Sequence, residues 1–224
     1  MILEKEQSPV CRRCGICCSK GGPALHIQDA PLVGDALPMH QLMTLRLGEM
    51  VYDQPLGKVV PLVEEIIKVR SAPDSSACVF FNADTKSCAV YENRPAECRV
   101  LLCENTDALR AMYEKDRLNR DHLLPQGHPL RALLEDHDQR SATGLLVSLA
   151  RKITEGDQQA VNHMGEIIAY DEELRRLLPE KTGLDPETMN FLLGRPVAQI
   201  LRGFGLEAIR EDGHLLLRKR PARF

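Results

Sequence analysis

The residues with the most evident chemistry are the eight cysteines, which fall into two groups along the chain. The groups are Cys11, Cys14, Cys17 and Cys18, followed by Cys78, Cys88, Cys98 and Cys103. A Cys-x-x-Cys spacing suits zinc and iron-sulfur sites, because one tight turn directs two sulfurs to the same centre. Clustering at ligand spacing is not a packing pattern for buried thiols. The pattern therefore predicts that all eight cysteines are metal ligands.

The adjacent pair Cys17 and Cys18 poses a question of geometry. Neighbouring side chains diverge, and their Cα atoms are only about 3.8 Å apart. We therefore expect the two residues to serve different centres, or one of them to be spare. Eight thiolates suffice for two zinc ions with four ligands each, or for two cubane clusters with one thiolate per iron. If ligands from both groups mix at each centre, the metal ties the intervening chain into one module.

The composition argues against several other classes of protein. The chain has 224 residues, 27% of them charged, and a formal net charge of −3. These values indicate neither global disorder nor a broad nucleic-acid-binding field. No apolar run approaches the roughly 20 residues that span a bilayer, and residues 1–6 lack the features of a signal peptide. We therefore expect a cytoplasmic protein, in which thiols stay reduced and metal ligation is favoured over disulfides.

The distribution of the cysteines predicts two regions. Residues 1–105 are expected to form a cysteine-rich metal-binding module, and residues 106–224 a mostly helical region that ends in a hairpin, although both regions could pack as one unit. The predicted fold class is mainly α, with an irregular cysteine-rich N-terminal module and a small C-terminal β-hairpin. Apolar residues at helical spacing predict amphipathic helices over about 146–153 and 164–178.

Local signals place several element boundaries. Asp185 followed by Pro186 predicts a helix start, and the break at residues 194–196 predicts that a new helix begins at Pro196. The pair Asp212-Gly213 predicts the turn of the C-terminal hairpin. Earlier in the chain, Pro38 is expected to open a helix that reaches Met50. Residues 62–67 are apolar and could form either a strand or a helix.

The cysteine motifs resemble a known family. The stretches C-R-R-C-G-I-C-C at 11–18, C-V-F-F at 78–81 and C-A-V-Y-E-N-R-P-A-E-C-R at 88–99 are similar to the bacterial CxxCxxCC family, which is described as zinc- or iron-chelating. The resemblance covers roughly residues 11 to 103 and adds Cys103 as the eighth ligand. The cysteine cluster of flagellin lysine methylase is similar and is taken to hold an iron-sulfur centre. The resemblance therefore implies iron-sulfur clusters, as [4Fe-4S], in preference to Zn2+.

Arg94 is a candidate for a role beside the cofactor, because it lies between Cys88 and Cys98. Its N–H groups could donate to cluster sulfur or to an anion and so tune the potential. The alternative is a simple ion pair with Glu92 or Glu97.

Other polar residues receive ordinary interpretations. We expect His26 to be a polar residue outside the metal centres, because eight thiols already saturate two of them. No H-E-x-x-H motif is present, so the remaining candidates are read as surface residues. We also expect the carboxylates of two helical faces and the basic C-terminal residues to be solvated surface residues. These residues are His122, His128, His137, Asp136, Asp138, Glu172, Glu173, Arg218, Lys219, Arg220 and Arg223.

The sequence thus predicts a cytoplasmic metal-binding protein with one or two cysteine-ligated iron-sulfur clusters, used for electron transfer or redox sensing. The helical region is expected to contact a protein partner, with no strong signal for nucleic acid. The alternative is an interaction module stabilised by two zinc tetrathiolate sites. A third reading is a modification enzyme such as a protein methylase. Because the chain has neither a nucleophile elbow nor a Rossmann glycine fingerprint, no catalytic residue is assigned.

Overall fold

The computed structural model describes residues 11–220 and divides into two compact units, each built from two stretches of chain. Unit 1 comprises Met1–Leu37 and Val69–Leu118, and unit 2 comprises Pro38–Lys68 and Asn119–Phe224. All eight cysteines belong to unit 1. The sequence predicted a boundary near residue 105 between a metal-binding module and a helical region. The two units do not test whether these regions fold separately, so the boundary stays a prediction.

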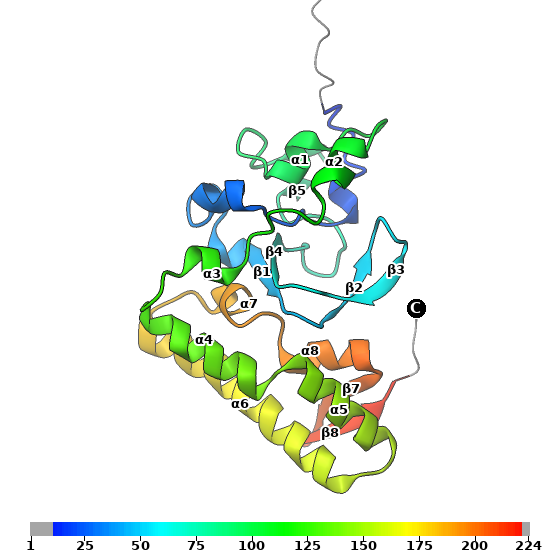
Figure 1. The fold of residues 1–224 in the computed structure, drawn as a ribbon, viewed down its shortest axis with the longest axis vertical. Helices are drawn as coiled ribbons and strands as arrows, with labels where there is room; N and C mark the ends of the chain where they lie inside the picture. The colour runs from blue at the N-terminus through cyan, green and yellow to red at the C-terminus, as the bar shows by residue number, and fades with distance from the viewer. Residues whose placement is uncertain (1–10, 221–224) are drawn as a thin grey trace, which may run out of the picture. The chain divides into compact units, whose positions relative to one another are not determined.

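Unit 1 consists mostly of loops between short elements (Figure 1). Its elements are the 3-10 helices η1 (Cys18–Lys20) and η2 (Ile27–Leu32), the strands β5 (Phe81–Asn82) and β6 (Ser87–Cys88), and the helices α1 (Ala96–Val100) and α2 (Asp107–Met112). Strands β5 and β6 pair as an antiparallel hairpin, with Phe81 opposite Cys88. The irregular, cysteine-rich N-terminal region expected from the sequence is therefore present.

The first stretch of unit 2 is extended, so the helix predicted from Pro38 to Met50 is wrong. Its elements are η3 (Met39–Gln41), β1 (Leu42–Leu45), β2 (Met50–Asp53), β3 (Lys58–Pro61) and β4 (Ile66–Val69). Strand β1 pairs with β4, and the Thr44 hydroxyl donates a hydrogen bond of 2.6 Å to the Phe191 carbonyl. These partners are distant in sequence, and they override the local helical spacing. The ambiguous segment 62–67 is not helical either, and its last two residues begin β4.

The second stretch of unit 2 holds the longer helices. Its elements are α3 (Arg120–Leu123), α4 (Pro129–Arg140), α5 (Thr143–Thr154), α6 (Gln158–Thr182), η4 (Pro186–Thr188), α7 (Met189–Leu192), α8 (Val197–Ile200), η5 (Leu201–Phe204), β7 (Leu206–Glu211) and β8 (His214–Lys219). Helices α4 and α5 lie along α6 (Figure 1). The structure is 43% helical and 19% strand, so helix predominates less than the mainly α prediction implied. No helix among residues 11–220 has the length and apolar character of a membrane span.

The predicted boundary signals act as expected in this stretch. The Asp185 carboxylate accepts a hydrogen bond of 2.9 Å from the Glu187 N–H, ahead of η4 and α7. The short helix α8 begins directly after Pro196. Strands β7 and β8 pair in register from Leu206–Lys219 to Glu211–His214, which leaves Asp212 and Gly213 as the turn. The C-terminal hairpin and the amphipathic helices α5 and α6 are therefore confirmed.

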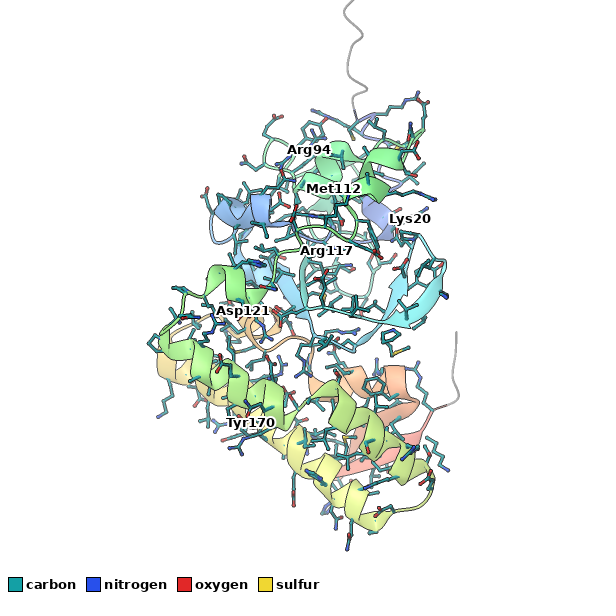
Figure 2. The ribbon with its side chains drawn as sticks, viewed as in Figure 1. Lys20, Arg94, Met112, Arg117, Asp121 and Tyr170 are labelled. Atoms are coloured by element: carbon teal, nitrogen blue, oxygen red, sulfur yellow. The ribbon has the colours of Figure 1, made fainter. Side chains whose placement is uncertain are left out.

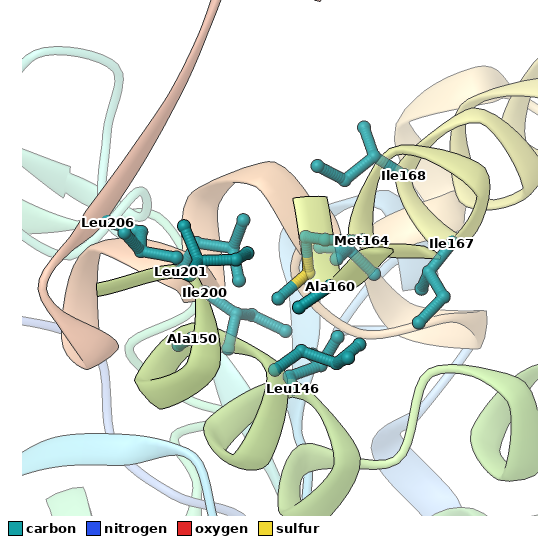
Figure 3. Close-up of a cluster of buried hydrophobic side chains, with 12 residues drawn as sticks. Leu146, Ala150, Ala160, Met164, Ile167, Ile168, Ile200, Leu201 and Leu206 are labelled. Carbon is teal, nitrogen blue, oxygen red and sulfur yellow. The ribbon is translucent and has the colours of Figure 1, made fainter. Parts of the chain in front are cut away.

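The core of unit 2 lies where α5 and α6 meet α8, η5 and the hairpin (Figure 3). Leu146 from α5 and Met164 and Ile168 from α6 are fully buried there, as are Leu201 and Leu206. Burying a side chain of this size stabilises a fold by about 1.5–3 kcal/mol relative to leaving it exposed. The helical spacing of the sequence thus corresponds to a real packed interface.

One polar residue assigned to the surface, His137, is buried, and that prediction was wrong; its neighbours Asp136 and Asp138 are partly exposed and form pairs. His137 on α4 is fully buried, and its Nε2 lies 2.8 Å from Asp171 Oδ1 on α6. Asp138 accepts a hydrogen bond of 2.6 Å from Arg120, and Asp136 accepts one of 2.7 Å from the Tyr170 hydroxyl. The interface between α4 and α6 is polar as well as apolar, so a hydrophobicity pattern does not reveal it.

The other surface assignments have mixed outcomes. His122 is exposed, whereas His128 is half-buried and accepts the Leu130 N–H at 3.2 Å. Glu173 is exposed and pairs with Arg176 at 2.6 Å, and Glu172 pairs with Arg210. In the basic tail, Arg218 pairs with Glu211 and Lys219 donates to the Thr154 carbonyl at 2.6 Å. Arg223 lies outside the described residues.

Candidate metal centre

The first Cys-x-x-Cys turn directs backbone N–H groups at its sulfurs. The Arg13 N–H donates to the Cys11 sulfur at 3.4 Å, and the Ile16 N–H donates to the Cys14 sulfur. The Ile16 bond lowers the pKa of Cys14, because a donated N–H stabilises the thiolate. Arg13 adopts a left-handed backbone with φ +53° to close this turn. The turn therefore favours the thiolate, which is the form that binds a metal.

Gly15 brings this turn against the hairpin that carries Cys88. Its φ is +80°, and an added Cβ would lie 2.4 Å from the Cζ atom of Phe81 on β5. A side chain at this position would be strained by the backbone and blocked by the ring. The glycine is therefore needed for close packing between the first cysteine group and the β5–β6 hairpin.

The sulfurs of Cys17, Cys18 and Cys78 lie close together beneath this turn. The Cys17 and Cys18 sulfurs are 3.9 Å apart, and the Cys78 N–H donates to the Cys18 carbonyl at 2.7 Å. Burial raises the pKa of Cys18 to about 12, and the neighbouring thiols Cys17, Cys78 and Cys88 raise it further in the same direction. Cys18 therefore lies within electrostatic range of these three thiols.

Helix α1 carries Cys98, which interacts with the same thiols. Burial raises the pKa of Cys98, and the nearby thiols of Cys78, Cys17 and Cys18 add to this effect. The helix starts directly after Pro95, and its first N–H, that of Ala96, donates to the buried Asp29 carboxylate at 2.9 Å. The Arg-Pro-x-x-Cys element of the sequence is therefore the start of the helix that positions this cysteine.

Cys103, which follows α1 in the sequence, interacts with the first cysteine group. Its thiol is hydrogen-bonded to Cys14, and this bond raises the pKa of Cys103, with Cys17 and Cys11 adding to it electrostatically. Arg12 forms an ion pair with Glu104, which joins the two segments next to their cysteines. Both Cys14 and Cys103 are exposed to solvent.

All eight predicted cysteines belong to unit 1, but among residues 11–220 no three Cys, His, Asp or Glu side chains form a group that could hold a metal ion. The donors are all thiols, which fit zinc or an iron-sulfur cluster and are soft ligands that hard cations disfavour. A bound cation would stabilise the thiolate forms of these side chains.

Comparison with known families agrees with this donor set. Residues 10–115 match the model of the CxxCxxCC family, described as a "Putative zinc- or iron-chelating domain". This part of the chain is therefore similar to the CxxCxxCC domain, the name used below for residues 10–115. This finding confirms the resemblance drawn from the cysteine motifs. No curated protein and no solved structure matches the chain, so the likeness of this domain to the cluster of flagellin lysine methylase rests on the motif alone.

Arg94 is held within the CxxCxxCC domain by an aromatic ring. Its guanidinium lies 3.7 Å from the centre of the Tyr91 ring, and that of Arg13 lies 4.0 Å from the same centre (Figure 2 labels Arg94). No ion pair joins Arg94 to Glu92 or Glu97 among the described residues, and its buried Nε has no hydrogen-bond partner there. Two guanidinium groups therefore gather beside the turn that carries Cys11 and Cys14.

The sequence interpretation missed a buried polar network that supports the cysteines. His26 is 2% exposed; its Nδ1 lies 2.7 Å from the Lys115 carbonyl and its Nε2 lies 3.4 Å from Glu97. Glu97, which precedes Cys98, also accepts the Ala24 N–H at 3.0 Å. His26 therefore positions the helix of Cys98 and does not face the thiols. The one feature of the sequence that pointed to this network was Glu97, a carboxylate inside the Arg-Pro-x-x-Cys element.

Proposed function

We propose that the CxxCxxCC domain holds one or two iron-sulfur clusters, as [4Fe-4S], and uses them for electron transfer or redox sensing in the cytoplasm. One observation carries the proposal: all eight cysteines, from separate segments of the chain, belong to unit 1, and the sulfurs of Cys17 and Cys18 are 3.9 Å apart there. Cubane clusters take one thiolate per iron, so this donor set is sufficient for two of them.

The exposure of the thiols supports a redox role. Cys14 and Cys103 are exposed, whereas Cys78 is buried. Electron transfer needs at least part of a cluster near the surface, and exposure is among the factors that set the potential of a cluster. The pair of guanidinium groups on Tyr91 adds positive charge beside the thiols and favours the reduced, more negative state of a cluster.

In this proposal, the helical unit 2 contacts a protein partner. Unit 2 has its own apolar core, so its surface is held without help from a metal. Val147 on α5 is 46% exposed and offers an apolar contact point on that surface. An electron-transfer or sensing protein needs such a surface to select its partner.

Metal analysis under anaerobic conditions tests the proposal. The protein is purified without oxygen, and iron, acid-labile sulfide and zinc are measured per chain beside a visible spectrum. We expect brown protein with near-equal iron and sulfide. Colourless protein with stoichiometric zinc and little iron would rule out the redox function.

Zinc is the second candidate, and one distance favours it. Two thiolates on a tetrahedral zinc ion are roughly 3.8 Å apart, given Zn–S bonds of about 2.3 Å. The Cys17 and Cys18 sulfurs are separated by 3.9 Å. In this alternative the metal only stabilises the fold, and the protein is an interaction module.

A further inference from the structure

Arg13 and Arg94 form a compact pair of positive charges around one aromatic ring of unit 1. Their guanidinium groups lie 4.0 and 3.7 Å from the centre of the Tyr91 ring. Two planar groups this close to the centre would overlap if they shared one face, so they cover opposite faces of the ring. Stacking orders an arginine side chain and leaves its N–H groups able to donate. The ring therefore holds two guanidinium groups in fixed positions.

These two guanidinium groups have no anionic partner in the described part of the chain. Arg12, which precedes Arg13, pairs with Glu104. Among residues 11–220, by contrast, neither Arg13 nor Arg94 forms an ion pair or a side-chain hydrogen bond, and the Nε atom of Arg94 is buried. Guanidinium groups bind carboxylates and phosphates through pairs of charge-assisted hydrogen bonds. The pair on Tyr91 is therefore suited to an anion from outside the chain.

The geometry of the pair distinguishes between kinds of anion. Single-stranded nucleic acid stacks its bases on aromatic rings, but both faces of Tyr91 are already covered. A small anion such as phosphate would contact only one guanidinium group, because the ring separates the two. An extended protein segment presents alternate side chains roughly 6.6 Å apart, so two of its carboxylates can contact both groups. Arg13 is exposed, which lets such a segment approach.

We propose that Arg13, Tyr91 and Arg94 form a docking site for an acidic segment of a partner protein. Two carboxylates at alternate positions of this segment each accept hydrogen bonds from one guanidinium group. The site adjoins the turn of Cys11 and Cys14, because Arg13 belongs to that turn. It lies in unit 1 and is additional to the partner surface proposed for unit 2. Only its use in electron transfer rests on the proposed function.

Peptide binding to the full chain, purified with its metal, tests the site. Fluorescence anisotropy compares a labelled hexaglutamate peptide with a hexaglutamine peptide, and inorganic phosphate serves as a competitor. We expect only hexaglutamate to bind, with an affinity that falls as salt is raised, because salt screens exposed charges. Absence of hexaglutamate binding at low salt overturns the proposal. Displacement of hexaglutamate by millimolar phosphate, at an ionic strength matched with chloride, identifies a small-anion site and also overturns it.

Matched substitutions separate the pair from the general charge of unit 1. Arg13→Gln and Arg94→Gln should each weaken hexaglutamate binding about tenfold, the loss expected for one charge-assisted hydrogen bond. Arg110→Gln is the control, because Arg110 is an exposed arginine of unit 1 that does not stack on Tyr91. Equal weakening in all three variants would show that only net charge matters and would overturn the site.

Tyr91→Leu tests the arrangement of the charges. It keeps both guanidinium groups but removes the ring that holds them, so binding should also fall about tenfold although the net charge is unchanged. Unchanged binding would contradict the role of the ring. Glu92→Gln should have the opposite effect and strengthen binding, since it removes an exposed carboxylate next to Tyr91 in the chain.

The wild-type protein provides a test that does not depend on the folding of a variant. Phenylglyoxal modifies arginine side chains, and peptide mass spectrometry locates the modified residues. Hexaglutamate should protect Arg13 and Arg94 from modification but not Arg110. Equal modification with and without hexaglutamate overturns the docking site and leaves the redox function standing. Zinc in place of iron would contradict the redox function and leave the docking site standing.

Discussion

The two units of this protein are stabilised by different kinds of interaction. In unit 2, residues from α5, α6, α8 and the terminal hairpin form a continuous apolar cluster. In unit 1 the fully buried apolar side chains include Leu25, Leu37 and Leu118, and buried polar groups also occur there: His26, Asp29 and Glu97. All eight cysteines also belong to unit 1, and Cys78 is buried. From this comparison we expect apolar burial to suffice for unit 2 and a ligand that links the thiols to stabilise unit 1.

Removal of the metal should produce the largest difference in stability between the two units. A chelator with a reductant is expected to abolish hydrogen-exchange protection in unit 1, because structural metal sites contribute on the order of 10 kcal/mol to small domains. Helices α5 and α6 should keep their protection. Hydrogen-exchange mass spectrometry measures both regions in one experiment. Equal loss of protection in both units would show that their stabilities are not distinct.

The converse change, in the core of unit 2, should leave the metal in place. Met164→Ala deletes a fully buried side chain and is expected to lower the free energy of unfolding by about 2–5 kcal/mol. Val147→Ala on the exposed face of α5 is the matched control, with an expected change within about 0.5 kcal/mol. Denaturant titration and metal analysis provide the two measurements. Metal loss in the Met164 variant would contradict the independence of unit 1.

A buried ion pair in unit 2 should respond to acid. Asp171 is 1% exposed and accepts hydrogen bonds from His137, Arg175 and the Val197 N–H. Although burial opposes the charge, the hydrogen bond from His137 and the charge of Arg175 lower the pKa of Asp171 to about 2. Asp171→Asn should lower the free energy of unfolding at neutral pH by about 3 kcal/mol, since it leaves its buried partners without a counter-charge.

The sign of the pH dependence follows from the lowered pKa of Asp171. Its contribution to stability is complete above the ordinary pKa of 3.8 and is lost as the pH falls toward 2. The free energy of unfolding should therefore fall less steeply between these pH values in Asp171→Asn than in the wild type. Denaturant titrations at several pH values measure the slope. An unchanged slope would mean that Asp171 is not the titrating group.

In unit 1, a smaller effect is expected from the glycine that packs the first turn against the hairpin. Gly15→Ala combines a left-handed backbone with a Cβ close to Phe81, and we expect a cost of about 1–3 kcal/mol together with weaker metal retention. Gly34→Ala is the control, because Gly34 also has a positive φ but its Cβ would meet no atom within 4 Å. Competition with a chromogenic chelator compares metal retention. Equal retention would show that only backbone strain matters.

The smallest expected change concerns Arg94. Arg94→Ala should leave the metal content unchanged and lower the reduction potential, because a positive charge beside the thiols favours the reduced state. Arg94→Lys retains the charge but not the planar contact with Tyr91, so its potential should lie closer to that of the wild type. Protein-film voltammetry measures the three potentials. An unchanged potential in Arg94→Ala would exclude a tuning role.

Local signals in the sequence determined several features. The Cys-x-x-Cys spacing identified the turn of Cys11 and Cys14, because its N–H···S bonds involve residues only two apart. Helices α5 and α6 and the β7–β8 hairpin were predictable for the same reason: apolar periodicity, Asp caps and an Asp-Gly turn act within one element. The family of the cysteine domain was also evident in the motifs.

The tertiary structure alone decided how distant parts of the chain combine. The pairing of β1 with β4 replaced a predicted helix, and contact with Asp171 buried a histidine expected at the surface. The neighbours of each cysteine, such as Cys103 beside Cys14, also depend on contacts between residues far apart in sequence. Such contacts depend on how the chain closes its long loops, and the pattern of residues within any single element does not specify them.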